Sequence, residues 1–307
     1  MLTTKPLVSI GMPVYNGMKF YSKKKINFEK ALCGILNQSY SNLEIIISNN
    51  CSNDETLNII KKYLKKDKRI KFYNQKKNIS STNNFRFVLS KAKGEYFKFN
   101  AHDDLISKDF ILRNLNFLLK NNDYAFCSSP FYIQENKKRK NLLKIKFLEG
   151  NTYDRIKNFF KIAIFSQACF CALFRKKYLE NNVFGNNTNL IHLKKDIICI
   201  DWLNTIQVLI NGRFKTIKQG KLIIGANGIS NQIGFIKDKI TIAGKNRFGI
   251  LFRYFFPIID FNIAFFKIIV NLKTISNFKK IHLNYLSFSY NWFFFKIVIK
   301  KILFKKK

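Results

Sequence analysis

Short strand-like runs alternate with helical segments over the first 128 residues, and this alternation limits the possible folds more than any other feature of the chain. The expected strands are 7–12, 43–48, 69–74, 96–100 and 124–128, and the expected helices are 29–36, 56–65, 83–92 and 110–121. We expect Pro13 to end the first strand, because proline cannot donate a sheet hydrogen bond. Strands that alternate with helices predict parallel βαβ units, and therefore an α/β protein with a mostly parallel central sheet flanked by helices.

Polar clusters follow three of the expected strands. They are Tyr15-Asn16, Ser48-Asn49-Asn50 and His102-Asp103-Asp104. In open α/β sheets, ligands bind beyond the carboxyl ends of the strands. The coincidence of the three clusters therefore predicts a ligand site at one edge of the sheet.

The acidic pair Asp103-Asp104 permits two interpretations. Adjacent carboxylates are hard oxygen ligands that can hold Mg²⁺, which takes its other ligands from water and phosphates. Such an ion would neutralise charge on a leaving diphosphate. The pair could instead belong to a solvated turn before the next helix, and spacing alone leaves both interpretations open. Neither a G-x-x-x-x-G-K-[ST] loop nor a G-x-G-x-x-G loop occurs in the chain.

The formal net charge of +37 suggests an anionic partner, which could be a nucleic acid, a membrane surface or a phosphorylated substrate. The bias of an AT-rich genome toward Lys, Asn, Ile and Phe would produce the same composition. A nucleic-acid-binding protein should carry stacking aromatic residues on exposed strands. Lysines are instead spread along the whole chain beside an ordered set of acidic loops, so we expect no nucleic-acid partner.

The cysteine and hydropathy patterns argue against a metal-thiolate site and a membrane span. The six cysteines form no C-x-x-C pair and only three histidines occur, so we expect buried, reduced thiols in a cytosolic protein. No signal sequence is expected at the start of the chain. No uninterrupted apolar run reaches the ~20 residues that a spanning helix needs.

Three segments in order resemble the opening signatures of family 2 glycosyltransferases. They are VSIGMPVYN at 8–16, ALCGILNQSYSNLEIIISNNCSNDET at 31–56 and GEYFKFNAHDDLIS at 94–107. The resemblance is strong over 7–115 and continues weakly to about 220. It implies a Rossmann-like GT-A domain at 1–220 that uses a nucleotide-sugar donor, a UDP-sugar before others, and Mn²⁺ or Mg²⁺. It also implies transfer with inversion to a glycan or lipid-linked acceptor, in the synthesis of a cell-surface polysaccharide.

The resemblance also implies roles for individual donor-site residues. The loop that would meet the nucleotide base consists of Pro13, Val14, Tyr15 and Asn16. Asn49 stands where the family usually has an aspartate that reads the uracil edge, and an amide can both donate and accept there. Asp54 lies in the S-x-D-x-T segment, although it would equally favour the start of the following helix.

Within the acidic cluster, the resemblance assigns the ribose contact to Asp103 and the metal to Asp104. His102 replaces the first acid of the commoner D-x-D pattern, and it could be a supporting group or an ordinary loop histidine. Because His102 and Asn49 both depart from the family pattern, an inactive relative stays open as an alternative.

An inverting transfer needs a general base for the acceptor hydroxyl. Asp201 is the candidate, because it precedes a helix with apolar residues at helical spacing and a G-x-F turn, as family members have there. Asp196 is the alternative base. Asp201 could also serve only as the N-cap of its helix.

The region 221–307 differs in composition from the rest of the chain. Its acids are Asp238 and Asp260 alone. Aromatic and basic residues gather near its end: Trp292, Phe293, Phe294, Phe295, Lys296, Ile297, Lys300 and Lys301. We expect a helical extension that lies at an anionic membrane surface or packs on the catalytic domain. The expected location is cytoplasmic and peripheral on the inner face of the cytoplasmic membrane.

Overall fold

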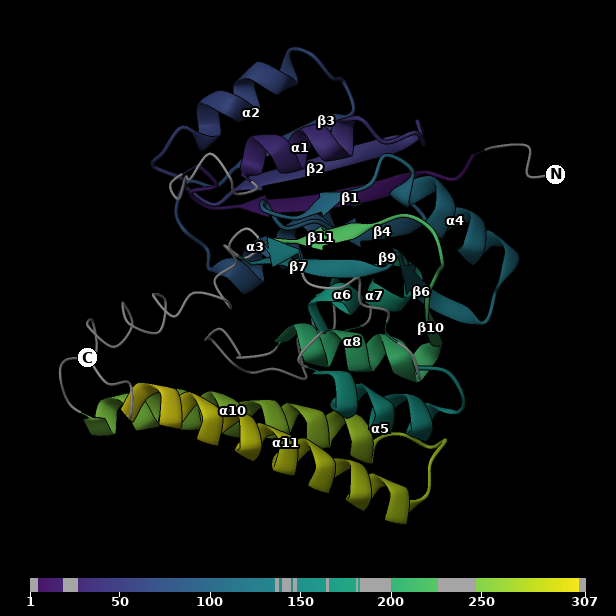
Figure 1. Ribbon diagram of the computed structural model, residues 1–307, viewed down its shortest axis with the longest axis vertical. Helices are drawn as coiled ribbons and strands as arrows, with labels where there is room; N and C mark the ends of the chain where they lie inside the picture. Colours follow the sequence, from purple (N-terminus) through teal and green to yellow (C-terminus); the bar gives the residue numbers. More distant parts are fainter. Residues whose placement is uncertain are drawn as a thin grey trace.

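The computed structural model describes residues 5–18, 27–135, 138–139, 145, 148–163, 166–180, 182, 200–225 and 247–303. Its main sheet has seven strands in the order β10-β6-β9-β4-β1-β2-β3 (Figure 1). These strands are β1 (Val8–Val14), β2 (Leu43–Asn49), β3 (Ile70–Asn74), β4 (Tyr96–Phe99), β6 (Tyr124–Ser128), β9 (Leu173–Arg175) and β10 (Arg213–Thr216). Only β9 runs antiparallel to its neighbours, β4 and β6. The predicted α/β class with a mostly parallel sheet is confirmed.

A smaller sheet and the helices complete the described structure. The second sheet has the order β5-β11-β7-β8, with bounds Leu105–Ile106, Leu222–Ile224, Phe131–Glu135 and Lys138–Arg139. The helices of the first half are α1 (Phe28–Leu36), α2 (Thr56–Leu64), α3 (Ser81–Ser90) and α4 (Phe110–Lys120). Those of the second half are α5 (Thr152–Ile162), α6 (Ser166–Phe170), α7 (Lys177–Glu180), α8 (Ile200–Asn211), α10 (Arg247–Val270) and α11 (Asn277–Leu303).

The first strand continues through Pro13, so the expectation that this proline ends it is wrong. β1 pairs with β4 only as far as Gly11, whereas its pairing with β2 continues to Val14. Pro13 therefore has a strand neighbour on one side only. Proline is tolerated at such an edge position, because no ladder bond on the other side requires its missing N–H.

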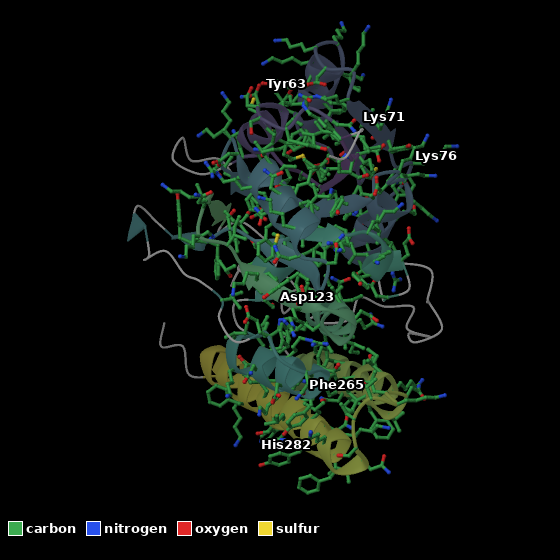
Figure 2. The ribbon with its side chains drawn as sticks, turned by 90° about the vertical axis from the view of Figure 1, so that its right-hand side faces the viewer. Tyr63, Lys71, Lys76, Asp123, Phe265 and His282 are labelled. Carbon is green, nitrogen blue, oxygen red and sulfur yellow. The ribbon has the colours of Figure 1, made fainter. Side chains whose placement is uncertain are left out.

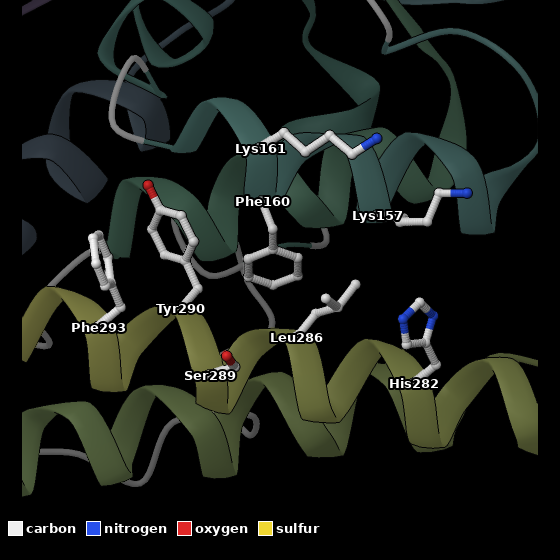
Figure 3. Close-up of a pocket in the computed structure, with 8 residues that line it drawn as sticks. All are labelled: Lys157, Phe160, Lys161, His282, Leu286, Ser289, Tyr290 and Phe293. Atoms are coloured by element: carbon white, nitrogen blue, oxygen red, sulfur yellow. The ribbon is translucent and has the colours of Figure 1, made fainter.

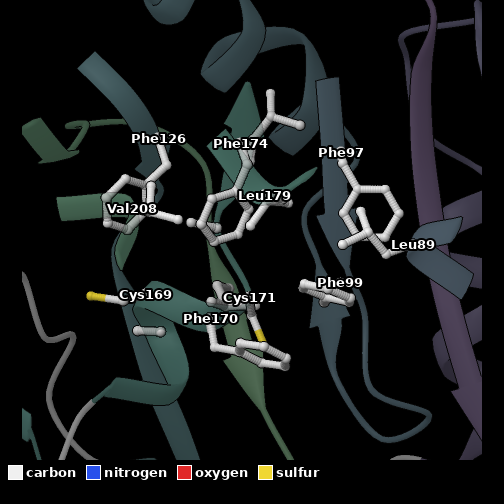
Figure 4. Packing of buried hydrophobic residues seen from close by; sticks show 14 of the residues in the cluster. Leu89, Phe97, Phe99, Phe126, Cys169, Phe170, Cys171, Phe174, Leu179 and Val208 are labelled. Atoms are coloured by element: carbon white, nitrogen blue, oxygen red, sulfur yellow. The ribbon is translucent and has the colours of Figure 1, made fainter. Parts of the chain in front are cut away.

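Stacked phenylalanines fix the short helix α6 against the sheet. Phe170, the last residue of α6, stacks on Phe99 at the end of β4, with ring centroids 4.7 Å apart (Figure 4). The ring of Phe174 in β9 stacks in the same way on Phe126 in β6, at 5.0 Å. Offset aromatic stacking adds to the burial of these rings. The carboxyl end of β4 and the helix α6 therefore form one packed unit.

The last two helices form a hairpin at the end of the molecule opposite α2 (Figure 1). α11 packs on α10 and α5, and α10 packs on α8. Figure 2 shows Phe265 and His282 in this hairpin, far from Tyr63 at the other end. Within the described part of the chain, no helix is both long enough and apolar enough to span a bilayer. The domain boundary expected at 220 stays a prediction. β11, which begins at Leu222, pairs with β5 and β7 from the part of the chain before that boundary.

Candidate functional site

The loops after β1 and β2 are tied together at the carboxyl edge of the sheet. Asn16 is buried and adopts a positive φ of 48°, a conformation that asparagine tolerates better than most residues. Its N–H donates to Ser52 Oγ at 2.9 Å, and its Oδ1 accepts from the N–H of Asn53 at 2.9 Å. The loop that contains the cluster Tyr15-Asn16 therefore contacts the loop that follows the cluster Ser48-Asn49-Asn50.

Asp54 connects the same two loops through its carboxylate. Its Oδ2 accepts from the Met18 N–H at 2.7 Å, and its Oδ1 accepts from the Thr56 N–H at 3.0 Å. Thr56 is the first residue of α2, so a carboxylate here also complements the positive end of the helix dipole. The geometry makes Asp54 a residue that holds the loop in shape.

Asn49 at the end of β2 is 1% exposed, and both ends of its amide have protein partners. Its Nδ2 donates to Asn74 Oδ1 at 2.8 Å, and its Oδ1 accepts from the Ser52 N–H at 3.3 Å. Pro13 and Val14 are buried within β1, whereas Tyr15 is 43% exposed. Of these loop residues, Tyr15 is the one that offers a large open surface to a ligand.

The turn after β4 buries both carboxyl groups of the acidic pair. Asp104 accepts from the Gly225 N–H through Oδ1 at 3.0 Å and from the Cys171 thiol through Oδ2 at 3.1 Å. Burial, together with the neighbouring Asp103 carboxylate, raises the pKa of Asp104 to about 7. A Cβ at Gly225 would collide with the carbonyl oxygen and the carboxylate of Asp103, so this position requires glycine. His102 in the same turn is partly exposed.

The sequence patterns missed Asn100, which shapes the acidic turn. Its Nδ2 donates to the carbonyl of Ala101 at 2.9 Å and to that of Asp104 at 3.2 Å. Its Oδ1 is buried without a hydrogen-bond partner among the described residues. Its place immediately after a buried strand was the available signal.

The sequence patterns also missed Lys98, which is fully buried in β4. Its Nζ donates to the carbonyls of Phe99 at 2.9 Å and Cys171 at 2.7 Å, and it lies 5.1 Å from the centre of the Phe110 ring. Burial lowers the pKa of this ammonium group. The lysine therefore joins β4 to the end of α6, directly beside the thiol that contacts Asp104.

The acidic pair has the donor chemistry that a hard divalent cation requires. Carboxylate oxygens suit Mg²⁺ and Mn²⁺, which also accept water and phosphate oxygens. The described residues contain no group of three possible ligands from His, Cys, Asp and Glu. An ion held here would therefore take one or two carboxylates from the chain and complete its shell with a diphosphate and water.

Asp201 lies in the first turn of α8 and accepts from the Ser166 hydroxyl through Oδ2 at 3.0 Å. Burial raises the pKa of Asp201 to about 6, and the Ser166 hydrogen bond opposes this rise. Because α8 includes Ile200, Asp201 lies inside the helix rather than before it, and the alternative that Asp201 is the N-cap is wrong. Its role as the base stays a prediction. Asp196, the alternative base, lies outside the described residues.

The helix α6 links the two candidate carboxylates. Ser166 at its start contacts Asp201, and Cys171 just past its end contacts Asp104. The two contacts are separated by five residues of helix, which rise ~7.5 Å. Such an arrangement can hold a cation and a diphosphate at one point and accept a proton at another. Neither Ser166 nor Cys171 was singled out by the sequence, because their contacts join residues distant along the chain.

Comparisons with known proteins agree with this geometry. The family model described as "Glycosyl transferase family 2" matches residues 9–183, more than half of the chain. The first curated relatives are uncharacterized glycosyltransferases, and the chain spans between 24% and 48% of their length.

Three named proteins are informative. A GalNAc(5)-diNAcBac-PP-undecaprenol beta-1,3-glucosyltransferase of Campylobacter jejuni is 30% identical over 200 residues, which cover 62% of this chain and 60% of that one. S. aureus TarS 1-349 in complex with UDP-GlcNAc aligns with a TM-score of 0.63 at 17% identity, covering 98% of this chain and 76% of that one. The mannosyltransferase PcManGT from Pyrobaculum calidifontis, in complex with GDP-Man and Mn²⁺, aligns with a TM-score of 0.55 at 15% identity, covering 99% and 77%.

Proposed function

The chain belongs to glycosyl transferase family 2, and from that premise we propose that it moves a sugar from a UDP-sugar to a hydroxyl of a glycan or lipid-linked acceptor, with inversion. The product is a cell-surface polysaccharide or its lipid-linked precursor. The reaction takes place at the inner face of the cytoplasmic membrane. The observation that carries the proposal is the pair of buried carboxylates, Asp104 and Asp201, that contact the two ends of α6.

The roles follow from the chemistry of each group. Asp104, with Asp103, would hold Mn²⁺ or Mg²⁺, which stabilises negative charge on the leaving diphosphate. Asp103 would also contact the ribose. The exposed ring of Tyr15 offers a face on which the nucleotide base can stack, while Asp54 and Asn16 keep that loop in shape. Asn49 would act on the base through the loop, because its amide already has protein partners.

Asp201 would accept the proton of the acceptor hydroxyl. A carboxylate with a pKa of about 6 is mostly ionised at neutral pH, and it is a stronger base than an ordinary aspartate. Ser166 would orient this carboxylate through its hydrogen bond. The TarS complex with UDP-GlcNAc supports a UDP-sugar donor, and the Campylobacter relative supports a lipid-linked acceptor. The Mn²⁺ in the Pyrobaculum complex supports the metal.

The test is a donor screen on the full chain. UDP-, GDP- and dTDP-sugars are offered with and without Mn²⁺ or Mg²⁺, and binding and slow donor hydrolysis are measured. We expect a UDP-sugar to bind only when the divalent ion is present. Binding of no nucleotide sugar under any of these conditions would contradict the proposed function.

Asp104→Ala tests the metal role within the same screen. We expect this variant to lose metal-dependent binding and transfer while it keeps the circular dichroism spectrum of the parent. Asp123→Ala is the matched control, because this carboxylate is exposed and forms a surface ion pair with the exposed Arg213. Full metal-dependent transfer by Asp104→Ala would remove the acidic pair from the mechanism.

A further inference from the structure

The outer side of the α10–α11 hairpin exposes a continuous apolar face. On α11 its residues are Phe278, Ile281, Tyr285, Phe288 and Trp292, which are 81%, 69%, 65%, 60% and 40% exposed. Their spacing of three, four, three and four residues places them on one side of the helix. On α10 the face continues through Ile263, Phe266 and Val270. Large apolar groups gathered on one surface in this way indicate a partner.

The buried side of the same hairpin combines polar and apolar contacts. Ser287 and Asn291 are buried, and both donate to Asn262 Oδ1, at 2.7 Å and 3.4 Å. Phe265 and Leu283 are buried beside them. The hairpin therefore carries apolar residues on its exposed side as well as on its buried side. A helix that packs on a domain and otherwise faces water usually carries polar residues on its exposed side.

The charge of the hairpin decides between a bilayer and a second copy of the chain. From 247 to 303 the only acidic residue is Asp260, whereas Lys267, Lys273 and Lys296 are exposed. Two copies that met through this face would bring like charges together. An anionic lipid surface instead attracts each of these lysines, while the aromatic side chains enter the interfacial region.

A groove beside the apolar face extends the surface toward α5. It has a volume of about 550 Å³ and lies between Lys157, Phe160 and Lys161 of α5 and five residues of α11 (Figure 3). Those five are His282, Leu286, Ser289, Tyr290 and Phe293. Apolar side chains form its floor and lysines lie on its α5 side, as Figure 3 shows. An anionic phospholipid is complementary to this groove, because it combines apolar chains with a negatively charged headgroup.

The hairpin also contacts the helix of the proposed base. Trp202, which follows Asp201, packs edge-to-face on Phe261 of α10 at 6.0 Å and on Tyr290 of α11 at 5.5 Å. A bilayer held against the hairpin would therefore lie on the acceptor side of the protein. The opposite end, with α2, would point away from it (Figure 1).

We propose that the outer face of the α10–α11 hairpin docks on an anionic phospholipid surface. This inference rests on the proposed function for its purpose, which is to bring Asp201 to a lipid-linked acceptor. Its test does not depend on activity, since binding to vesicles is measured without donor or acceptor.

The experiment measures sedimentation of the full chain with vesicles of phosphatidylglycerol and phosphatidylcholine at 3:7, and of phosphatidylcholine alone. We expect binding to the anionic vesicles that is at least tenfold stronger. Lys267→Glu/Lys273→Glu/Lys296→Glu should weaken it by about a hundredfold, because each lysine near an anionic surface contributes to binding. Lys61→Glu/Lys65→Glu/Lys68→Glu is the matched control, since these exposed lysines lie in and after α2. That control should change binding less than threefold.

The apolar contribution is tested with Phe278→Ser/Ile281→Ser/Phe288→Ser, which should weaken vesicle binding at least tenfold without changing the melting temperature. Equal loss in both lysine variants would show a nonspecific effect of net charge and overturn the proposal. A dimer in solution that the triple serine variant dissociates would identify a second copy as the occupant and overturn it too. Asp201→Asn should bind vesicles like the parent, so a failed function and a failed docking surface remain distinguishable.

Discussion

The carboxyl edge of the sheet buries charged side chains, whereas the C-terminal hairpin exposes large aromatic side chains. At the edge of the sheet, Asp103, Asp104 and Lys98 are buried. Asp104 accepts from the Gly225 N–H, and Lys98 donates to the carbonyl of Cys171. In the hairpin, large aromatic residues lie in the open, while serine and asparagine are buried. Burying charge and exposing aromatic surface both cost free energy in water. Both regions therefore have the character of surfaces that contact something other than water.

The largest effect is expected from Asp201→Asn, which tests whether the buried carboxylate of Asp201 is the general base. The amide cannot accept the acceptor's proton, so transfer should fall by about 10²–10⁴-fold, the usual contribution of a general base. Binding of the UDP-sugar should stay within threefold of the parent. Single-turnover transfer and donor titration measure the two quantities. Unchanged transfer would assign the base to another residue.

Two phenylalanines test the hairpin half directly. Phe265 is fully buried in α10 and Phe278 is 81% exposed in α11. Phe265→Ala should lower the free energy of unfolding by about 3–5 kcal/mol through lost burial and a cavity. Phe278→Ala should change it by less than about 0.5 kcal/mol, because the side chain has few contacts to lose. Urea unfolding of both variants in detergent-free buffer measures the two free energies of unfolding. Equal losses would show that Phe278 is packed as tightly as Phe265.

Two glycines test how tightly the sheet edge is packed. Gly225→Ala places a methyl group against Asp103, and overpacking of this kind costs about 1–3 kcal/mol. Gly34→Ala is the matched control, because its Cβ would meet Leu105 at an ordinary 3.4 Å and alanine favours a helix. We expect a lower melting temperature and weaker Mn²⁺ binding only for Gly225→Ala. A Gly225→Ala protein that melts and binds Mn²⁺ like the parent would show that this edge is loosely packed.

The smallest effect concerns the pH dependence of transfer. Since the proposed base must be ionised, activity should fall as the pH drops through about 6. The Ser166 hydrogen bond lowers the pKa of Asp201, so Ser166→Ala should raise it and move the acid limb of the kcat profile to higher pH. Thr205→Val is the control, because the Thr205 hydroxyl donates to the backbone carbonyl of Asp201. If the acid limb of the kcat profile of Ser166→Ala lies at the same pH as that of the parent, Ser166 contributes only to packing.

Sequence patterns were sufficient for the elements of the first half. The expected helix 56–65 corresponds to Thr56–Leu64, and the expected strand 124–128 is Tyr124–Ser128. Hydrophobic periodicity acts between residues that are close along the chain, which is why the sequence shows it there. Pro13 was misjudged because its tolerance depends on where β4 stops pairing, which is a property of the sheet.

Some residues of the candidate site could be predicted from the sequence, and others could not. Asp103, Asp104 and Asp201 are visible as acids at element boundaries, and the order of strands and helices already brings such boundaries to one edge. Lys98, Ser166, Cys171 and Gly225 gave no usable signal, and Asn100 gave only its place after a buried strand. Each acts through a partner that the fold supplies, such as the Asp104 carboxylate for Cys171.

The C-terminal region is where the sequence predicted least about which side chains are exposed. Its composition indicated helices rich in aromatic and basic residues, and it drew attention to 292–301. The side chains of Phe294, Phe295, Ile297, Lys300 and Lys301 lie outside those described, and Asp238 does as well. The exposed face instead runs from Phe278 to Trp292 and continues on α10.

The sequence alone therefore determined the α/β class, the order of its elements and the acids at their ends, because local periodicity and chain order are written in it. The tertiary structure alone decided which of the hairpin's apolar residues face outward and how α6 spaces Asp104 from Asp201. Those properties depend on contacts between residues far apart in the chain, and packing selects such contacts only when the whole chain has folded.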